Sequence, residues 1–281
     1  MKNIVVATDL SVTARNAYRY ARALSKTLGV GLSIVHVKEN VMNITDVVRT
    51  PFPSNNDLEL IKDIEELVTE ENQAMGINAS EHEVKIRILS GDPVDVLASL
   101  SKTEATDLIV IGTTGLSDVL TKIFGSVSSK VSNKAHCPVI LVPRNARWKN
   151  IEQILYASDH DSMKAEFAQD IMDFAVKMNA GIHFVNVRNY DPVGEIKQKD
   201  IDWGELFVTS NSNLPYETST IYGNDTVKEL NEYCEGKSID LMVFASKHRN
   251  FWENLMHKSI TENMALSTDT PIMVVHKDDK K

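Results

Sequence analysis

The chain has 281 residues, of which 42% are hydrophobic and 25% are charged, and it holds only 12 glycines and 8 prolines. These proportions exclude collagen-like, low-complexity and disordered chains, and the length suits two domains of ordinary size. The 39 acidic residues against 30 basic ones give a formal net charge of -9. That balance argues against non-specific nucleic-acid binding, because nothing offsets repulsion from phosphate.

The composition also indicates a reducing compartment. Two cysteines, Cys137 and Cys234, are too few for a disulfide framework or a multi-cysteine metal site. Asp9 and Arg15 interrupt any apolar start, so no secretory signal is expected. Apolar runs such as Leu108 to Ile111 are far shorter than the ~20 residues that a bilayer crossing needs. We therefore expect a soluble, cytoplasmic protein without a membrane segment.

Short apolar runs rich in β-branched residues alternate with longer amphipathic stretches in the first half of the chain. The runs predict strands at Asn3 to Thr8, Leu32 to Val37, Glu83 to Leu89, Asp107 to Ile111 and Pro138 to Val142. The stretches predict helices at Ser11 to Leu28, Asp57 to Met75, Pro93 to Thr103 and Ser126 to Ala135. Ser11 and Asp92 suit N-caps, and Pro93 suits a first helical turn. Strand–helix alternation predicts a parallel sheet with helices on both faces.

The chain repeats itself. At an offset of 150, two ungapped pairs of segments match: Ile4–Asp9 with Ile154–Asp159, and Gly31–Val37 with Gly181–Val187. At an offset of 133, two further pairs match: Asp107–Ile111 with Asp240–Phe244, and Pro138–Ile140 with Pro271–Met273. Two registers of this length indicate a tandem duplication whose second copy lost about 17 residues in its middle. We expect one domain over residues 1–146 and a second over residues 147–281.

A spaced set of glycines follows the fourth predicted strand. Gly112-Thr113-Thr114-Gly115 and, nine residues later, Gly125-Ser126 form the pattern G-x2-G-x9-G-S. Glycines let backbone N–H groups approach a phosphate, and a helix beginning at Ser126 adds its positive end. Thr113 and Ser126 add hydroxyl groups. Glycines alone could serve only as turn formers, but Asp9 also ends the first strand and can accept a hydrogen bond from a ribose hydroxyl or a base amine. Asp9 could equally cap the helix near Ser11.

These features together resemble the universal stress protein family over nearly the whole chain. The motifs that carry the resemblance are Ala7-Thr8-Asp9-Leu10-Ser11, Ile34-Val35-His36-Val37, Gly91-Asp92-Pro93 and the glycine pattern. The resemblance implies an α/β, Rossmann-like fold of two tandem open parallel five-stranded sheets flanked by helices. It also implies ATP binding where the glycine pattern is kept.

The resemblance further implies a role for each matching position. Thr8 and Asp9 would meet the adenine and ribose end of the nucleotide, and Val37 would pack against adenine. The ribose and phosphates would be surrounded by Gly112, Gly115, Gly125, Ser126 and Val127. The family's last strand often pairs domains, so the two copies could form an internal dimer, and further self-association stays open.

The second copy departs from the glycine pattern. Ala245, His248 and Lys258 stand where the first copy has glycines, and Ser259 and Asp159 are retained. A side chain at each glycine position obstructs close backbone approach. We expect this copy not to bind nucleotide as the first copy does, and to serve as a packing or regulatory partner.

The sequence assigns no catalytic residue and no metal ligand. It has no P-loop lysine motif and no nucleophile elbow, so at most slow ATP hydrolysis is expected. His36 is interpreted as a strand-end residue, Cys137 and Cys234 as packed side chains, and Asp159-His160-Asp161 as helix-capping rather than metal-binding.

The predicted function is ATP binding in a stress-response or signalling protein, with or without a divalent ion such as Mg²⁺. AMP and ADP stay open as alternative nucleotides. Three alternatives stay open. They are a weak ATPase or phosphotransfer enzyme, a scaffold that binds no nucleotide, and a small-ligand carrier that uses the second copy.

Overall fold

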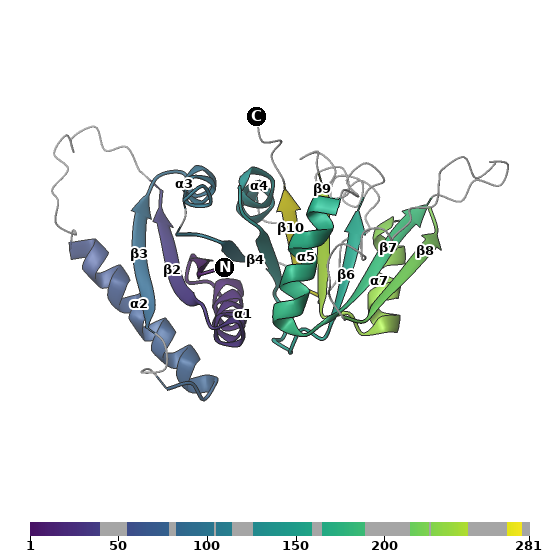
Figure 1. Ribbon diagram of the computed structural model, residues 1–281. Helices are drawn as coiled ribbons and strands as arrows, with labels where there is room; N and C mark the ends of the chain where they lie inside the picture. Colours follow the sequence, from purple (N-terminus) through teal and green to yellow (C-terminus); the bar gives the residue numbers. More distant parts are fainter. Residues whose placement is uncertain are drawn as a thin grey trace. The chain divides into compact units, whose positions relative to one another are not determined.

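A computed structural model of the chain describes residues 1–39, 55–78, 83–103, 105–113, 126–158, 165–188, 214–224, 226–246 and 269–276. The chain divides into two compact units, Met1–Trp148 and Lys149–Lys281. Both are built from parallel strands and helices (Figure 1). The sequence placed the boundary two residues earlier, whereas Trp148 lies with the first unit, its ring 4.8 Å from that of Tyr20.

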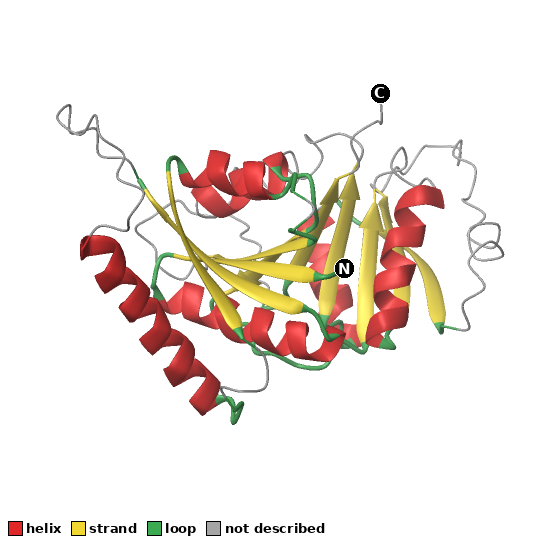
Figure 2. Ribbon diagram, turned by 60° about the vertical axis from the view of Figure 1, so that its left-hand side comes forward, coloured by secondary structure: helices red, strands yellow, loops and turns green. Residues whose placement is uncertain are grey.

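The first unit follows the predicted alternation of strands and helices. Its strands are β1 (Asn3–Thr8), β2 (Gly31–Lys38), β3 (Val84–Ser90), β4 (Leu108–Thr113) and β5 (Val139–Pro143). Its helices are α1 (Val12–Leu28), α2 (Asn55–Ala74), α3 (Pro93–Leu100) and α4 (Ser126–Lys134). The strand order is β3-β2-β1-β4-β5, and Figure 2 shows helices on both faces of the strands. The predicted α/β fold class is confirmed.

The second unit repeats that order. Its described elements are β6 (Gln153–Ser158), α5 (Ala165–Met178), β7 (Gly181–Arg188), β8 (Tyr216–Tyr222), α7 (Thr226–Lys237), β9 (Leu241–Ser246) and β10 (Ile272–His276). The strands are arranged β8-β7-β6-β9-β10, with β6 in the place of β1. The same order in both units is what a duplicated sequence requires.

Strand register locates the residues that the second copy lacks. Leu32 of β2 lies level with Val84 of β3, and Ile182 of β7 lies level with Tyr216 of β8. Leu32 and Ile182 differ by 150 in number, whereas Val84 and Tyr216 differ by 132. The shortening therefore falls between β7 and β8, in the interval where the first unit carries α2.

Both predicted helix caps of the first unit are confirmed. The Ser11 side chain accepts a hydrogen bond from the backbone N–H of Ala14, and that of Asp92 accepts one from Asp95. The α3 helix was predicted to reach Thr103 but ends at Leu100. Beyond that residue the backbone tightens into bonds spanning three residues, such as Thr103 N–H to the Leu100 carbonyl at 3.0 Å.

In each unit, an aspartate at the same position of the repeat bridges two strands at their amino ends. Both backbone N–H groups of Lys2 and Asn3 donate to Asp107 Oδ2, at 2.7 and 2.9 Å. Both N–H groups of Glu152 and Gln153 donate to Asp240 Oδ2, at 2.9 and 3.1 Å. These acids stand at matching positions of the repeat. Each one holds the start of the central strand, β1 or β6, against its neighbour β4 or β9.

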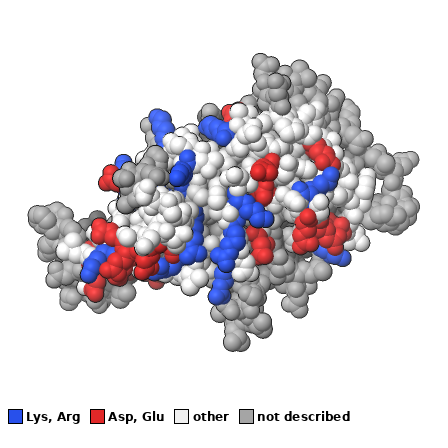
Figure 3. All heavy atoms as spheres, turned by 90° about the horizontal axis from the view of Figure 1, so that it is seen from below, with Lys and Arg blue, Asp and Glu red and all other residues white. Residues whose placement is uncertain are grey.

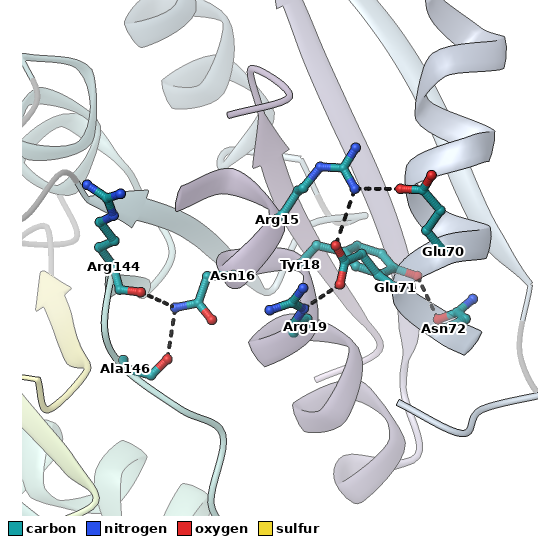
Figure 4. A network of polar contacts seen from close by, with 9 residues as sticks. All are labelled: Arg15, Asn16, Tyr18, Arg19, Glu70, Glu71, Asn72, Arg144 and Ala146. Atoms are coloured by element: carbon teal, nitrogen blue, oxygen red, sulfur yellow. Dashed lines mark hydrogen bonds and ion pairs between the residues drawn. The ribbon is translucent and has the colours of Figure 1, made fainter. Parts of the chain in front are cut away.

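Charged side chains join α1 to α2 (Figure 4). Arg15 Nη1 lies 2.7 Å from a carboxylate oxygen of Glu70 and 3.4 Å from one of Glu71. Arg19 also pairs with Glu71, whose side chain is only 4% exposed. Figure 3 shows the acidic side chains of α2 gathered with basic ones beside them. Because Glu71 is buried, removing its arginine partners would leave an unpaired buried charge. That loss would destabilise the fold more than the loss of an exposed ion pair.

One asparagine ties α1 to the segment that follows β5. Asn16 Nδ2 lies 3.3 Å from the carbonyl oxygen of Arg144 and 2.9 Å from that of Ala146 (Figure 4). It also lies 3.0 Å from the carbonyl oxygen of Pro143. Asn16 is buried. Its amide therefore donates to carbonyl groups at and just after the end of β5.

Replacing Asp107 by alanine is expected to lower the free energy of unfolding by about 1–3 kcal/mol at neutral pH, because two N–H donors lose a charged acceptor. Partial burial by itself would raise the pKa of Asp107, but the two backbone donors outweigh it and the pKa lies below its ordinary value. The carboxylate therefore stabilises the fold above the unfolded-state pKa, and this stabilisation is lost as the pH falls through the lower folded-state pKa. Urea unfolding at neutral and acidic pH measures both effects.

The matched control for this variant is Asp63→Ala, an exposed acid on α2 whose loss is expected to change stability by less than about 0.5 kcal/mol. A difference between Asp107→Ala and wild type that persists unchanged in acid would contradict the assignment.

Candidate functional site

The carboxyl ends of three neighbouring strands form the candidate site of the first unit. Strand β1 lies between β2 and β4, and the strand order reverses there, because β2 and β3 lie on one side and β4 and β5 on the other. Ligands of open parallel sheets bind at such a point. Thr8 ends β1, Val37 lies one residue before the end of β2, and Gly112 and Thr113 end β4.

Five of the predicted site residues thus lie at one edge of the sheet: Thr8, Asp9, Val37, Gly112 and Thr113. Ser126 and Val127 begin α4, as predicted. Gly115 and Gly125 lie outside the described residues.

The turn after β1 is held by consecutive hydrogen bonds. Thr8 Oγ1 accepts from the backbone N–H of Leu10 at 3.1 Å, and Asp9 Oδ1 accepts from that of Ser11 at 3.0 Å. Between them, Leu10 has a φ of 66°, a left-handed conformation that a leucine rarely adopts. Ser11 rather than Asp9 caps α1. Asp9 supports the capping residue, and its exposed carboxylate is oriented through one oxygen.

Gly112 has a packing role that its place in the glycine pattern did not reveal. A Cβ at this position would lie 2.5 Å from the carbonyl oxygen of Thr13 and 2.8 Å from its carbonyl carbon. The first turn of α1 therefore rests directly on the end of β4. Thr113 is 4% exposed, and its hydroxyl lies 3.4 Å from the carbonyl oxygen of Val142.

The matching edge of the second unit is described only in part. Ala245 lies in β9, where the first unit has Gly112. Asp159, His160, Asp161, His248, Lys258 and Ser259 lie outside the described residues. Across the residues with described placement, no group of three or more His, Cys, Asp or Glu side chains could hold a metal ion.

A pocket at the opposite end of the second unit was not predicted from the sequence. It encloses about 720 Å³ at the amino ends of β6, β7 and β8, and both lysines and carboxylates line it. His183 lines this pocket and is 8% exposed. Its Nε2 lies 2.9 Å from Gln153 Oε1, and its Nδ1 lies 3.1 Å from the Tyr233 hydroxyl.

The repeat held a signal for this cluster. His183 matches Ser33 and Gln153 matches Asn3, and in the first unit the Ser33 hydroxyl donates to Asn3 Oδ1 at 3.3 Å. The change from a buried serine to a histidine indicates that the amino ends of the strands differ between the two units.

Both cysteines are buried, as the sequence indicated. Burial raises the pKa of the Cys137 thiol to about 12 and that of Cys234 to about 12. Both are therefore thiols at neutral pH and poor nucleophiles. No helix among the described residues combines the length and apolar character that a bilayer crossing requires.

Comparison with known proteins gives concordant results. The model of the Universal stress protein family matches residues 1–143. A universal stress protein of Thermus aquaticus is 33% identical over 141 residues, which cover 50% of this chain and 98% of the relative. One from Methanocaldococcus jannaschii is 30% identical over 149 residues, covering 51% of this chain and 82% of the relative. The crystal structure of a universal stress protein from Archaeoglobus fulgidus covers 98% of both chains at 19% identity, with a TM-score of 0.70. This last similarity extends the shared fold to both units.

Gly112→Ala is expected to lower the free energy of unfolding by about 1–3 kcal/mol, because the added methyl group meets the backbone of α1. Gly236→Ala is the control. Outside the adjoining backbone of α7, no heavy atom of the described residues lies within 4 Å of its Cβ position, so this change is expected to stabilise by about 0.5–1 kcal/mol. Thermal unfolding without ligand measures both. Unchanged stability of Gly112→Ala would disprove the packing role.

The stability of the second unit is expected to fall as the pH drops below about 6.5, the ordinary histidine pKa. Burial lowers the pKa of His183, opposed by Glu217 and assisted by Lys237. The unfolded chain therefore takes up the proton first, and acid favours unfolding. Denaturant unfolding between pH 7 and pH 5 measures the slope. His183→Ser, which restores the residue of the first unit, is expected to flatten it, and an identical slope would contradict the assignment.

Proposed function

Because the chain belongs to the universal stress protein family, we propose that its first unit binds an adenine nucleotide, with ATP as the principal ligand. The observation that carries the proposal is the convergence of Thr8, Asp9, Val37 and Gly112 at the point where the strand order reverses. Asp9 there presents an exposed carboxylate whose orientation is set by its bond to the Ser11 N–H.

The residues suit the two ends of a nucleotide differently. The carboxylate of Asp9 can accept from ribose hydroxyls, and Val37 offers an apolar surface to the base. In this proposal the phosphates lie along the backbone between Gly112 and the start of α4, where Gly115, Gly125, Ser126 and Val127 supply N–H groups and the helix supplies its positive end. A divalent ion such as Mg²⁺ would accompany the phosphates.

We assign binding rather than fast turnover to this site. A phosphoryl transfer needs a cationic clamp, a metal and a positioned nucleophile, and the sequence holds no P-loop lysine motif. A weak ATPase or phosphotransfer activity is the second candidate.

The second unit serves as a packing or regulatory partner in this proposal. The sequence has Ala245 at the position that matches Gly112. The predicted internal dimer of the two copies and any self-association belong to the same proposal, as does a stress-response or signalling role.

Isothermal titration calorimetry with ATP tests the proposed site. We expect saturable binding of one ATP per chain, weakened about tenfold or more by Asp9→Ala, since a charged acceptor of two hydroxyl groups is worth about 1.5–3 kcal/mol. Gly115→Ala is expected to weaken ATP as well, because its methyl group blocks backbone approach to phosphate. Asp159→Ala, the matching change in the second copy, is the control and should bind as the wild type does.

Absence of heat and of any thermal shift at millimolar ATP would refute nucleotide binding and leave the scaffold interpretation. Equal losses in Asp9→Ala and Asp159→Ala would refute the assignment to the first unit. Release of labelled phosphate that Asp9→Ala abolishes would favour the weak ATPase. Mass spectrometry of the denatured, purified protein identifies any ligand that it retains.

A further inference from the structure

We propose that His36 is a positioning residue for the base and ribose half of this site. Its imidazole ties the end of β2 to the end of β1 and so sets the separation of Val37 from Asp9. The inference rests on the proposed function, because His36 would align the ends of β1 and β2 for a nucleoside that contacts both.

The tie is a single hydrogen bond between neighbouring strands. His36 Nδ1 lies 2.9 Å from the carbonyl oxygen of Thr8, and the two residues are level in the parallel register. A carbonyl oxygen only accepts, so Nδ1 carries the hydrogen and donates it. In the adjoining turn, the N–H groups of Leu10 and Ser11 donate to the Thr8 hydroxyl and the Asp9 carboxylate.

The bond stands at the residue where the ladder of β1 stops. Thr8 is the last residue of its strand and is 7% exposed, so little water reaches it. Without His36 the Thr8 carbonyl would lose its side-chain donor and keep only the backbone bond that the register with β2 gives it. We expect the turn to relax and Asp9 to lose its fixed relation to Val37, while the end of β4 and the start of α4 stay in place.

The repeat supplies a natural comparison. Asn186 matches His36 at the offset of 150 that aligns β1 and β2 with β6 and β7. An asparagine amide nitrogen stands at the same number of bonds from the backbone as a histidine Nδ1, and it also donates. The first unit can therefore be tested with the residue that the second unit already carries.

Three variants of the full chain test the proposal: His36→Leu, which removes the donor at similar size, His36→Asn, which restores it, and Asn186→Leu as the control. Calorimetry with ATP, adenosine and inorganic tripolyphosphate separates the two halves of the site. For His36→Leu we expect ATP and adenosine to bind about three- to tenfold more weakly, as loss of one hydrogen bond predicts, and tripolyphosphate to bind unchanged. His36→Asn should recover most of the adenosine affinity, and Asn186→Leu should match the wild type.

The outcomes that overturn the proposal are distinct. Equal weakening of adenosine and tripolyphosphate by His36→Leu would show a general structural role, and so would failure of His36→Asn to restore adenosine binding while its thermal unfolding matches the wild type. Undiminished adenosine binding by His36→Leu would remove the tie altogether. If the wild type binds neither ATP nor adenosine, the proposed function fails and this inference fails with it. If the wild type binds both and only the variants disagree, the proposed function stands.

Discussion

A parallel strand that stops inside a covered sheet leaves N–H and C=O groups that its ladder no longer pairs, and both units depend on side chains to satisfy them. At the amino end, Asp107 and Asp240 each accept two backbone N–H groups from the start of the central strand. At the carboxyl end of the first unit, the Thr8 hydroxyl accepts from the turn, and the His36 side chain adds a donor to the Thr8 carbonyl at the last pair of the β1–β2 ladder. These bonds hold the central strand in register, and every other strand is placed relative to it.

The two units resemble each other more at the amino ends of their strands than at the carboxyl ends. The amino-end carboxylate is the same residue in both units and makes the same two bonds. The neighbouring pair changed from Asn3 and Ser33 to Gln153 and His183, but a side-chain hydrogen bond between the two strands was kept. At the carboxyl end the glycine pattern of the first copy has no counterpart in the second. Retention at one end and divergence at the other suit a division between holding the sheet together and contacting a ligand.

Nucleotide binding fits the first unit because its fixed groups lie where a ligand would need them. Asp9 is oriented by the Ser11 N–H before any ligand arrives, so little ordering remains to be done on binding. The candidate site also shares a residue with the packing of the first unit. The backbone of Gly112 in β4 packs directly against the first turn of α1. The same helix contains Asn16, whose amide donates to carbonyl groups at and after the end of β5. A residue of the glycine pattern can therefore serve stability and ligand approach together.

The sequence by itself determined the duplication, the alternation of strands and helices, the order in which they follow and the caps at Ser11 and Asp92. These depend on short-range periodicity and on which side chains can reach a neighbouring backbone N–H. Only the tertiary structure decided that Asp107 and Asp240 bridge strands and that α1 packs against the backbone of Gly112. It also decided that His36 donates to the Thr8 carbonyl and that His183 lines a pocket. Each of these joins residues far apart in the chain or opposed across a sheet, and no local pattern records such a distance. The candidate site falls between these cases. Its residues were readable as motifs, and the bonds of Thr8 and Asp9 are local, but which strand ends lie beside one another depended on the strand order.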